Sequence, residues 1–436
     1  MNLLVSIPMS STSKIPSAPA VSRRGVLQAG IVGAAGLAVG SGRAASAATL
    51  QTAPLHQLLL LSNEWNTIIN DAAKRASAVL GLPYQSTTFN LNDTLALTQA
   101  QSAAAAGAKL FLINSVDGSG LKKIAKTAEA AGGALVNVGS NLPWTSPIDA
   151  GPAFAQGFLT REDVGLYEAV KYTVGLAVKK FGPNAKFLHI TGPKGAFVDN
   201  LRSNSVHRAV AEFPGVTIVG SLPGNWSASD GQKATEDLIS RHGVPNGIIA
   251  QNDGSLTGVL AALRGLKIQA GEEVLTVGVD GATDILRAIK AGKVAATAFQ
   301  SPAYHGIQAV ARLYDALNGY RPSAPERFVG FAGVLVTKDN VDGVLRRYVD
   351  NKNLPFDPKL LSHVISGDKW DPQAPLVPIK YEDYYASAGL EKPVGYQPPA
   401  DYLKAIKSGE FDRVTRRYTE AYKLKLDDFG YGGIEA

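Results

Sequence analysis

The chain has 436 residues, 43 of them Lys or Arg against 37 Asp or Glu, and it contains no cysteine. The absence of cysteine excludes disulfides, thiolate metal ligands, a cysteine nucleophile and a lipid anchor on cysteine. Four of the basic residues and none of the acids lie in the first fifty positions, so 39 basic residues face 37 acidic ones in the remainder. That near balance gives no reason to expect a nucleic-acid partner.

The first fifty residues predict an export leader. Residues 22–28 read Ser-Arg-Arg-Gly-Val-Leu-Gln, which is a twin-arginine pattern, and residues 26–39 form an apolar run rich in Gly and Ala. The run is too short to span a bilayer, and the small residues at 45–48 supply a cleavage site. We therefore expect residues 1–48 to be a signal peptide of the twin-arginine type. The mature protein is expected in the bacterial periplasm, not embedded in the membrane.

Strand and helix patterns alternate from residue 55 to about residue 335. Continuous apolar runs, typical of parallel strands covered on both faces, stand at residues 58–61, 110–113, 134–138, 187–190, 216–219, 247–250, 274–279 and 294–299. The clearest helical patterns are at residues 66–80 and 164–181. This alternation predicts an α/β fold with two doubly wound parallel-sheet domains that meet near residues 160–161.

Three of the apolar runs end in polar side chains. Asn252 follows the run at 247–250, Asp280 ends the run at 274–279, and Gln300 follows the run at 294–299. Ligands of open parallel sheets bind beyond the carboxyl ends of the strands, so we expect these three side chains to converge on one crevice. Two amides and a carboxylate offer donors and acceptors that suit a neutral ligand covered in hydroxyl groups.

The composition changes after about residue 340. Residues 341–436 hold nine of the fifteen Tyr and eight of the twenty-four Pro, and strand patterns disappear there. Two helices are expected, over residues 382–388 and 401–424. The Tyr, Leu and Val content is too apolar for a free tail, so residues 341–436 are predicted to be an extension packed on the body of the protein.

Several segments occur in the order and spacing of a known family. They are Leu-Ile-Asn at 112–114, Ala-Gln-Asn-Asp at 250–253, Val-Gly-Val-Asp-Gly at 277–281 and Ala-Thr-Ala-Phe-Gln at 296–300. Over about residues 55–340 the chain resembles the periplasmic sugar-binding proteins of the ribose-binding type. The resemblance implies two α/β lobes joined by three hinge strands, with crossings near Arg161, Gln300 and Phe331. The N-terminal lobe would comprise residues 55–160 and 301–330, and the C-terminal lobe residues 161–300 and 331–340.

The resemblance also implies the roles of individual side chains. It assigns sugar contacts to four polar residues and stacking positions to two aromatic ones: Asn114, Asn252, Asp280, Gln300, Trp65 and Trp226. Independently, the C–H face of a sugar packs well on an aromatic ring, and Trp has an N–H to donate to a hydroxyl. Trp144 lies on a predicted cleft-side loop as well, and the sequence leaves open whether it serves the site or ordinary packing.

The chain departs from the family pattern in two places. Gly139 and Ser140 stand where sugar binders commonly carry an Asp-Arg pair, and Asn200 stands at the position of a cleft Arg, with Arg202 two residues on. Ser140, Asn200 and Arg202 are therefore additional candidates for ligand binding. Glu64 is another, which would either add negative charge beside the cleft or be solvated. These departures leave open whether the ligand is a ribose-like sugar, a polyol or another small hydroxylated metabolite.

We expect a solute-binding protein that captures a sugar or polyol by hinge closure and delivers it, as a monomer, to the permease of an ABC importer. The alternative is a ligand-loaded periplasmic sensor that partners a membrane receptor, and neighbouring genes would discriminate between the two.

We expect no enzyme activity, no cofactor and no metal site. The six His lack metal-ligand spacing, and no G-x-S-x-G motif occurs. His189, in an apolar run, is predicted to be a core residue. Asp253 and Asp280 could be imagined as an acid/base pair, but their neighbours match a binding family without catalysis.

Overall fold

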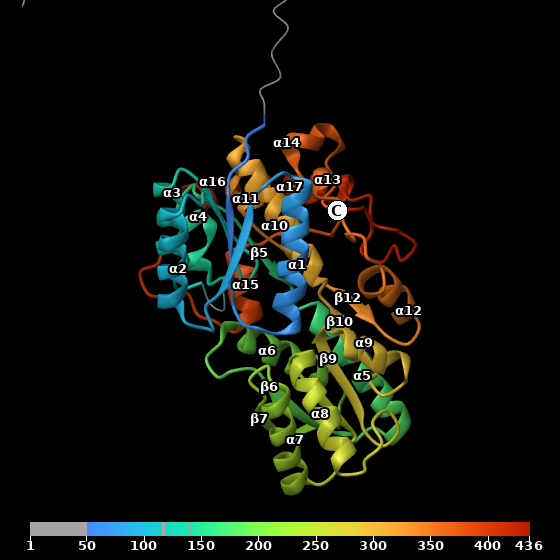
Figure 1. The fold of residues 1–436 in the computed structure, drawn as a ribbon. Coiled ribbons are helices and arrows are strands. Elements are labelled where there is room, and N and C mark those ends of the chain that lie inside the picture. The colour runs from blue at the N-terminus through green and yellow to red at the C-terminus, as the bar shows by residue number, and fades with distance from the viewer. Residues whose placement is uncertain (1–49, 116–117, 140) are drawn as a thin grey trace, which may run out of the picture. The chain divides into compact units, whose positions relative to one another are not determined.

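Two mainly parallel β-sheets organise the chain (Figure 1). The structure is a computed structural model that describes residues 50–115, 118–139 and 141–436. The predicted leader, residues 1–48, and the candidate Ser140 therefore lie outside the described residues.

The N-terminal lobe is built on a seven-stranded sheet of order β13-β11-β5-β4-β3-β1-β2. Its strands are β1 (Leu55–Leu59), β2 (Tyr84–Thr88), β3 (Leu110–Ile113), β4 (Ala134–Asn137), β5 (Phe154–Thr160), β11 (Phe328–Phe331) and the antiparallel β13 (Val377–Pro378). Its main helices are α1 (Glu64–Val79), α2 (Asp93–Ala105), α3 (Leu121–Ala130) and α10 (Pro302–Leu317). Successive strand residues point to opposite faces: Leu112 packs with α1 and α10, whereas Phe111 packs with α2 and α3.

The C-terminal lobe repeats this arrangement on a six-stranded sheet of order β12-β10-β9-β8-β6-β7. Its strands are β6 (Lys186–Thr191), β7 (Thr217–Pro223), β8 (Gly247–Ala250), β9 (Leu275–Asp280), β10 (Ala296–Phe299) and the antiparallel β12 (Val334–Val336). Its helices are α5 (Gly165–Phe181), α6 (Phe197–Ala211), α7 (Ala228–His242), α8 (Asp253–Gly265) and α9 (Thr283–Lys290). Ile248 packs with α7, α8 and α9, and Ile249 with α5 and α6.

The chain passes between the two sheets after Thr160, after Phe299 and after Phe331, and it returns once more to the N-terminal sheet between β12 and β13. The first and third crossings are tied together, because the Arg161 backbone N–H donates to the Phe331 carbonyl at 2.8 Å. The predicted α/β class, with two lobes built on parallel sheets, is confirmed.

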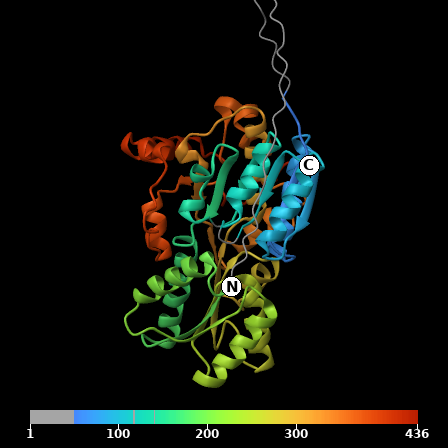
Figure 2. The ribbon, with the colours of Figure 1, turned by 90° about the vertical axis from the view of Figure 1, so that its left-hand side faces the viewer.

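Short elements complete the two lobes and form the extension, residues 341–436. They are η1 (Pro143–Thr145), α4 (Pro147–Ala150), α11 (Ala324–Arg327), α12 (Val341–Val344), the π-helical η2 (Leu345–Val349), α13 (Pro358–Leu361), α14 (His363–Ser366), η3 (Gly367–Lys369), α15 (Tyr381–Ala388), α16 (Ala400–Lys407) and α17 (Glu410–Ala421). The extension packs on both lobes (Figure 2). Phe356 and Trp370 are buried in the core of the N-terminal lobe, and Val344 in that of the C-terminal lobe.

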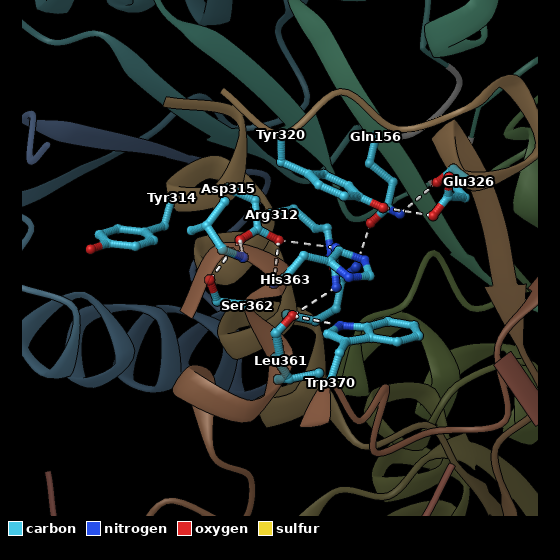
Figure 3. Close-up of polar contacts among 12 residues, drawn as sticks. Gln156, Arg312, Tyr314, Asp315, Tyr320, Glu326, Leu361, Ser362, His363 and Trp370 are labelled. Carbon is cyan, nitrogen blue, oxygen red and sulfur yellow. Dashed lines mark hydrogen bonds and ion pairs between the residues drawn. The ribbon is translucent and has the colours of Figure 1, made fainter. Parts of the chain in front are cut away.

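A buried ion pair anchors the extension to α10 (Figure 3). The Asp315 carboxylate lies 3.1 Å from Arg312 and accepts hydrogen bonds from the Ser362 hydroxyl at 2.6 Å and the His363 backbone N–H at 3.0 Å. Arg312 also donates to the Leu361 carbonyl at 2.7 Å. Because both charged side chains are almost fully buried, these bonds satisfy groups that would otherwise destabilise the fold.

Two predictions about the extension are wrong. The single helix expected over residues 401–424 is two helices, α16 and α17, separated at Gly409, whose φ of +69° breaks the right-handed helix. The expectation that strands are absent after residue 341 also fails, because β13 pairs with β11. This strand has two residues and contains Pro378, which is tolerated at the edge of a sheet, so it left no recognisable pattern.

Candidate ligand-binding site

A cavity of about 760 Å³, part of it open to solvent, lies between the two lobes. The cavity is lined by all six residues that the sequence placed in the site: Trp65, Asn114, Trp226, Asn252, Asp280 and Gln300. Arg202, one of the additional candidates, lines it too, whereas Asn200 is exposed on α6 and does not.

The strand tips meet because their strands are neighbours and mostly parallel. Asn252 caps the N-terminus of α8, its side chain accepting a hydrogen bond from the Ser255 N–H at 2.8 Å. Gln300 follows β10, and its backbone N–H donates to the Asp280 carbonyl at 3.1 Å. Asp280 itself has a φ of +123°. Such strained backbone is uncommon outside glycine and concentrates at functional sites.

A second buried carboxylate holds the strained turn in place. Asp253 accepts hydrogen bonds from the backbone N–H groups of Gly281 at 2.7 Å and Ala282 at 2.8 Å, and from the Thr297 hydroxyl at 3.0 Å. Burial raises the pKa of Asp253 well above its usual range. Because its oxygens are engaged by the protein, Asp253 positions the loop that carries Asp280.

One arginine serves two carboxylates in the wall of the cavity. Nη2 of Arg202 lies 2.9 Å from Oε1 of Glu162 and 3.2 Å from Oδ1 of Asp280. Glu162 also accepts from Nε2 of Gln300 at 2.8 Å. Burial raises the pKa of the Asp280 carboxyl to about 7; Arg202 opposes this rise and Glu162 adds to it. Arg202 is therefore the arginine of this cavity. The sequence pattern placed Asn200 at the position of the family's cleft arginine, and Asn200 does not line the cavity.

Two tryptophans flank the polar wall. Trp65 stands in the first turn of α1, its ring edge-on to His305 at 5.2 Å between centroids. Trp226 follows β7 in a turn where it has a φ of +56°. Its Nε1 and the Nε of Arg202 are buried and have no hydrogen-bond partner among the described residues. Trp144 instead stacks on Tyr385 at 5.8 Å and does not line the cavity.

The two lobes touch beside the cavity. Oε1 of Glu64, at the start of α1, accepts a hydrogen bond from the backbone N–H of Thr283 at 3.0 Å. Thr283 begins α9 of the other lobe, so Glu64 places a negative charge where a helix N-terminus favours one. Glu64, Trp65 and Trp226 line a smaller hollow beside the cavity.

The sequence did not identify some residues that line the cavity. Glu162 follows β5, so the acid next to the expected crossing at Arg161 was a usable signal. Asn66 lies within α1, where its side-chain oxygen accepts a hydrogen bond from the Asn114 side chain at 3.2 Å. Tyr384 comes from α15 of the extension, and no local pattern connects it with the site. Gly139 also lines the cavity; a Cβ there would come within 2.2 Å of the Ser115 carbonyl oxygen.

The family described as "Periplasmic binding protein domain" matches residues 60–321. The chain belongs to the periplasmic binding protein family. A ribose import binding protein of Haemophilus influenzae is 26% identical over 61% of this chain and 85% of its own length. A xylitol-binding protein of Mycolicibacterium smegmatis is 28% identical over 41% of this chain and 50% of its own.

A solved structure agrees in fold. The binding component of an arabinose ABC transporter from Shewanella, bound to L-arabinofuranose, has a TM-score of 0.60 at 20% identity, over 69% of this chain and 96% of its own. The resemblance noted from the sequence is therefore confirmed. This periplasmic binding protein is a solute-binding component of the bacterial periplasm, and its family is not catalytic.

Two further observations concern only the described residues. No group of three or more His, Asp or Glu side chains could hold a metal ion there. No described helix combines the length and apolar character needed to cross a membrane.

Proposed function

We propose that the protein captures a sugar or polyol in the cavity between its lobes and delivers it to an ABC importer. The observation that carries this proposal is one cavity in which amide, carboxylate and guanidinium side chains lie beside two indole rings. The polar members, Asn114, Asn252, Gln300, Asp280 and Arg202, offer both hydrogen-bond donors and acceptors. A buried polar group without a partner costs about 1–3 kcal/mol, so a ligand rich in hydroxyls suits this lining.

The rings of Trp65 and Trp226 favour a saturated ring or carbon chain as the body of the ligand. Aliphatic C–H groups pack on indole faces, while the hydroxyls of the same ligand reach the polar wall. The relatives named above support this class: their names record ribose, xylitol and L-arabinofuranose. Asn114, Asn252 and Gln300 would complete the hydrogen bonds to the remaining hydroxyls.

Hinge closure would couple binding to delivery. Cavity residues come from both lobes and from the crossings between them, so a ligand gains its full set of contacts only when the lobes are together. The Glu64–Thr283 hydrogen bond then adds a direct contact between the lobes. A permease could distinguish the loaded protein by this closed arrangement, and we propose that a monomer suffices for that encounter.

The test is to identify the ligand directly. Native mass spectrometry of protein purified from the periplasm should show a bound species with the mass of a monosaccharide or polyol. Calorimetric titration with D-ribose, xylitol and L-arabinose should then give saturable binding for at least one of them. A co-purified amino acid, peptide or nucleotide, with no binding of the three probes, would overturn the proposed ligand class.

We further propose export through the twin-arginine route. The support is the Arg23-Arg24 pair, the apolar run behind it and the small residues at 45–48.

A further inference from the structure

Helix α15 of the extension lies across the boundary between the two lobes, directly above α6 in Figure 1. On the N-terminal side, the Tyr381 hydroxyl donates to the Asp149 carboxylate at 2.9 Å. On the C-terminal side, the Tyr384 ring packs on Phe197 of α6, with 5.2 Å between centroids. Tyr384 also meets Phe328 of β11 at 5.6 Å. A single helix turn therefore contacts both lobes.

These contacts belong to one apolar core, which we call the bridging cluster. Its members come from the N-terminal lobe, the C-terminal lobe and the extension: Ile148, Leu159 and Phe328; Phe197 and Leu201; and Ile379, Tyr381, Tyr384, Tyr385, Ala388, Tyr402, Ala405 and Phe411. All are buried. Opening of the lobes would separate Phe197 and Leu201 from α15 and expose apolar surface to water, which is unfavourable in proportion to the area exposed.

Tyr384 joins this cluster to the ligand cavity. It is 4% exposed, and among the described cavity-lining residues it is the one that lies beyond Asn340. Burial raises the pKa of its hydroxyl well above the usual value, so the group stays a neutral donor. The family match ends at residue 321, so Tyr384 is an addition that the matched part of the chain does not contain.

We propose that α15 is a third wall of the ligand site: Tyr384 contacts the bound solute and, through Phe197, favours the closed arrangement of the lobes. The ligand contact rests on the proposed function, whereas the effect on closure does not. With Tyr384 in place the cavity is bounded on the α15 side. Removal of its ring would widen the cavity and weaken the closed state.

The closure can be measured without a ligand. Because the chain has no cysteine, spin labels can be attached at cysteines introduced for Gln101 on α2 and Glu236 on α7, both exposed. Double electron–electron resonance would report the distance between the lobes. Tyr384→Ala should shift the distribution to longer distances. The matched control is Tyr418→Ala, a buried tyrosine of the extension whose ring packs on Trp370 in the core of the N-terminal lobe, outside the bridging cluster, and it should not shift the distances.

Phe197→Ala removes the other side of the same contact and should reproduce the shift, which covers the case in which Tyr384→Ala does not fold. Unchanged distances in the folded variants, or an unliganded wild type that is already fully open, would overturn the effect on closure.

The ligand contact is tested by removing one oxygen atom. Tyr384→Phe should weaken the best of the three probes, D-ribose, xylitol and L-arabinose, by about five- to tenfold, the effect of one hydrogen bond. Tyr385→Phe should leave its affinity unchanged. Equal affinities of wild type and Tyr384→Phe would refute the ligand contact. If the wild type binds none of the three probes, both the proposed ligand class and the Tyr384 contact are rejected. The distance measurement still tests the effect of Tyr384 on closure.

Discussion

Arg202 and Asp280 form an ion pair in the wall of the cavity, 3.2 Å apart between Nη2 and Oδ1. The same nitrogen lies 2.9 Å from Glu162, so one cation serves two largely buried carboxylates. This sharing explains why burial still raises the pKa of Asp280 although an arginine lies beside it. The negative charge that Arg202 leaves uncompensated favours ligands that donate hydrogen bonds.

Loss of Arg202 should destabilise the fold. Arg202→Met leaves Glu162 and Asp280 without their cation, and an unpaired buried charge costs about 3–5 kcal/mol. Urea unfolding measures the difference. The control is Arg241→Met, because Arg241 pairs with Asp237 at the surface, where both side chains are at least half exposed; its effect should stay below about 1 kcal/mol. Equal effects of the two changes would contradict the role of Arg202 as the cation shared by Glu162 and Asp280.

Asp280 should be required for affinity more than for folding. Asp280→Asn keeps a residue that tolerates the positive φ but removes the charge, so affinity for the identified ligand should fall about ten- to a hundredfold. Calorimetric titration checks this. Asp284→Ala, an exposed acid on α9 outside the cavity, should bind as the wild type does. Unchanged affinity in Asp280→Asn would move the site elsewhere.

Stability should depend on pH through Asp280. Its pKa is raised in the folded protein, from 3.8 to about 7, so the folded state holds a proton that the unfolded chain releases. The stabilisation is fully present below about pH 4 and is lost as the pH rises through about 7. When the unfolding free energies of wild type and Asp280→Asn are compared from pH 4 to 8, the stability of the wild type relative to the variant should fall as the pH rises. If the stability of the wild type relative to the variant stayed constant or rose with pH, the raised pKa of Asp280 would be contradicted.

The ion pair that anchors the extension should contribute as much to stability as a buried core residue. Asp315→Ala removes the acceptor of Ser362 and His363 and leaves Arg312 buried without its partner, so a loss of about 3–5 kcal/mol is expected. Limited proteolysis should then cut within residues 358–370. Asp342→Ala, which breaks an exposed pair with Lys290, is the control. A chain ending at Asn340 should aggregate; normal melting and binding of that chain would show that the extension is only a tether.

Export should depend on the paired arginines of the leader. Replacing both Arg23 and Arg24 by Lys should leave the precursor in the cytoplasm, as cell fractionation would show, because the twin-arginine route reads that pair. Replacing Lys14 by Arg is the control and should not alter delivery. Normal periplasmic delivery of the double variant would reject the route but not the leader.

Much of the polar site followed from sequence because parallel strands impose a simple rule. The carboxyl ends of neighbouring parallel strands share one edge, so Asn252, Asp280 and Gln300 could be brought together from the pattern of apolar runs alone. The side-chain contacts of Arg202 could not. Arg202 and Asn200 both lie on α6, but only Arg202 lines the cavity. Which face of α6 points to the cavity depends on how the helix packs against the sheet.

The sequence by itself determined the two lobes, the order of their strands and helices and the polar strand tips, because these depend on local periodicity and on rules of connection. The crossings near Gln300 and Phe331 were expected from the family resemblance alone. Only the tertiary structure decided that Glu162 joins Arg202 to Gln300 and that α15 brings Tyr384 into the cavity. Tyr384 follows Asp280 by more than one hundred residues, and no local pattern records such a contact. It arises when the extension buries its apolar side chains against both lobes, and that burial depends on the surfaces that the rest of the chain has already built.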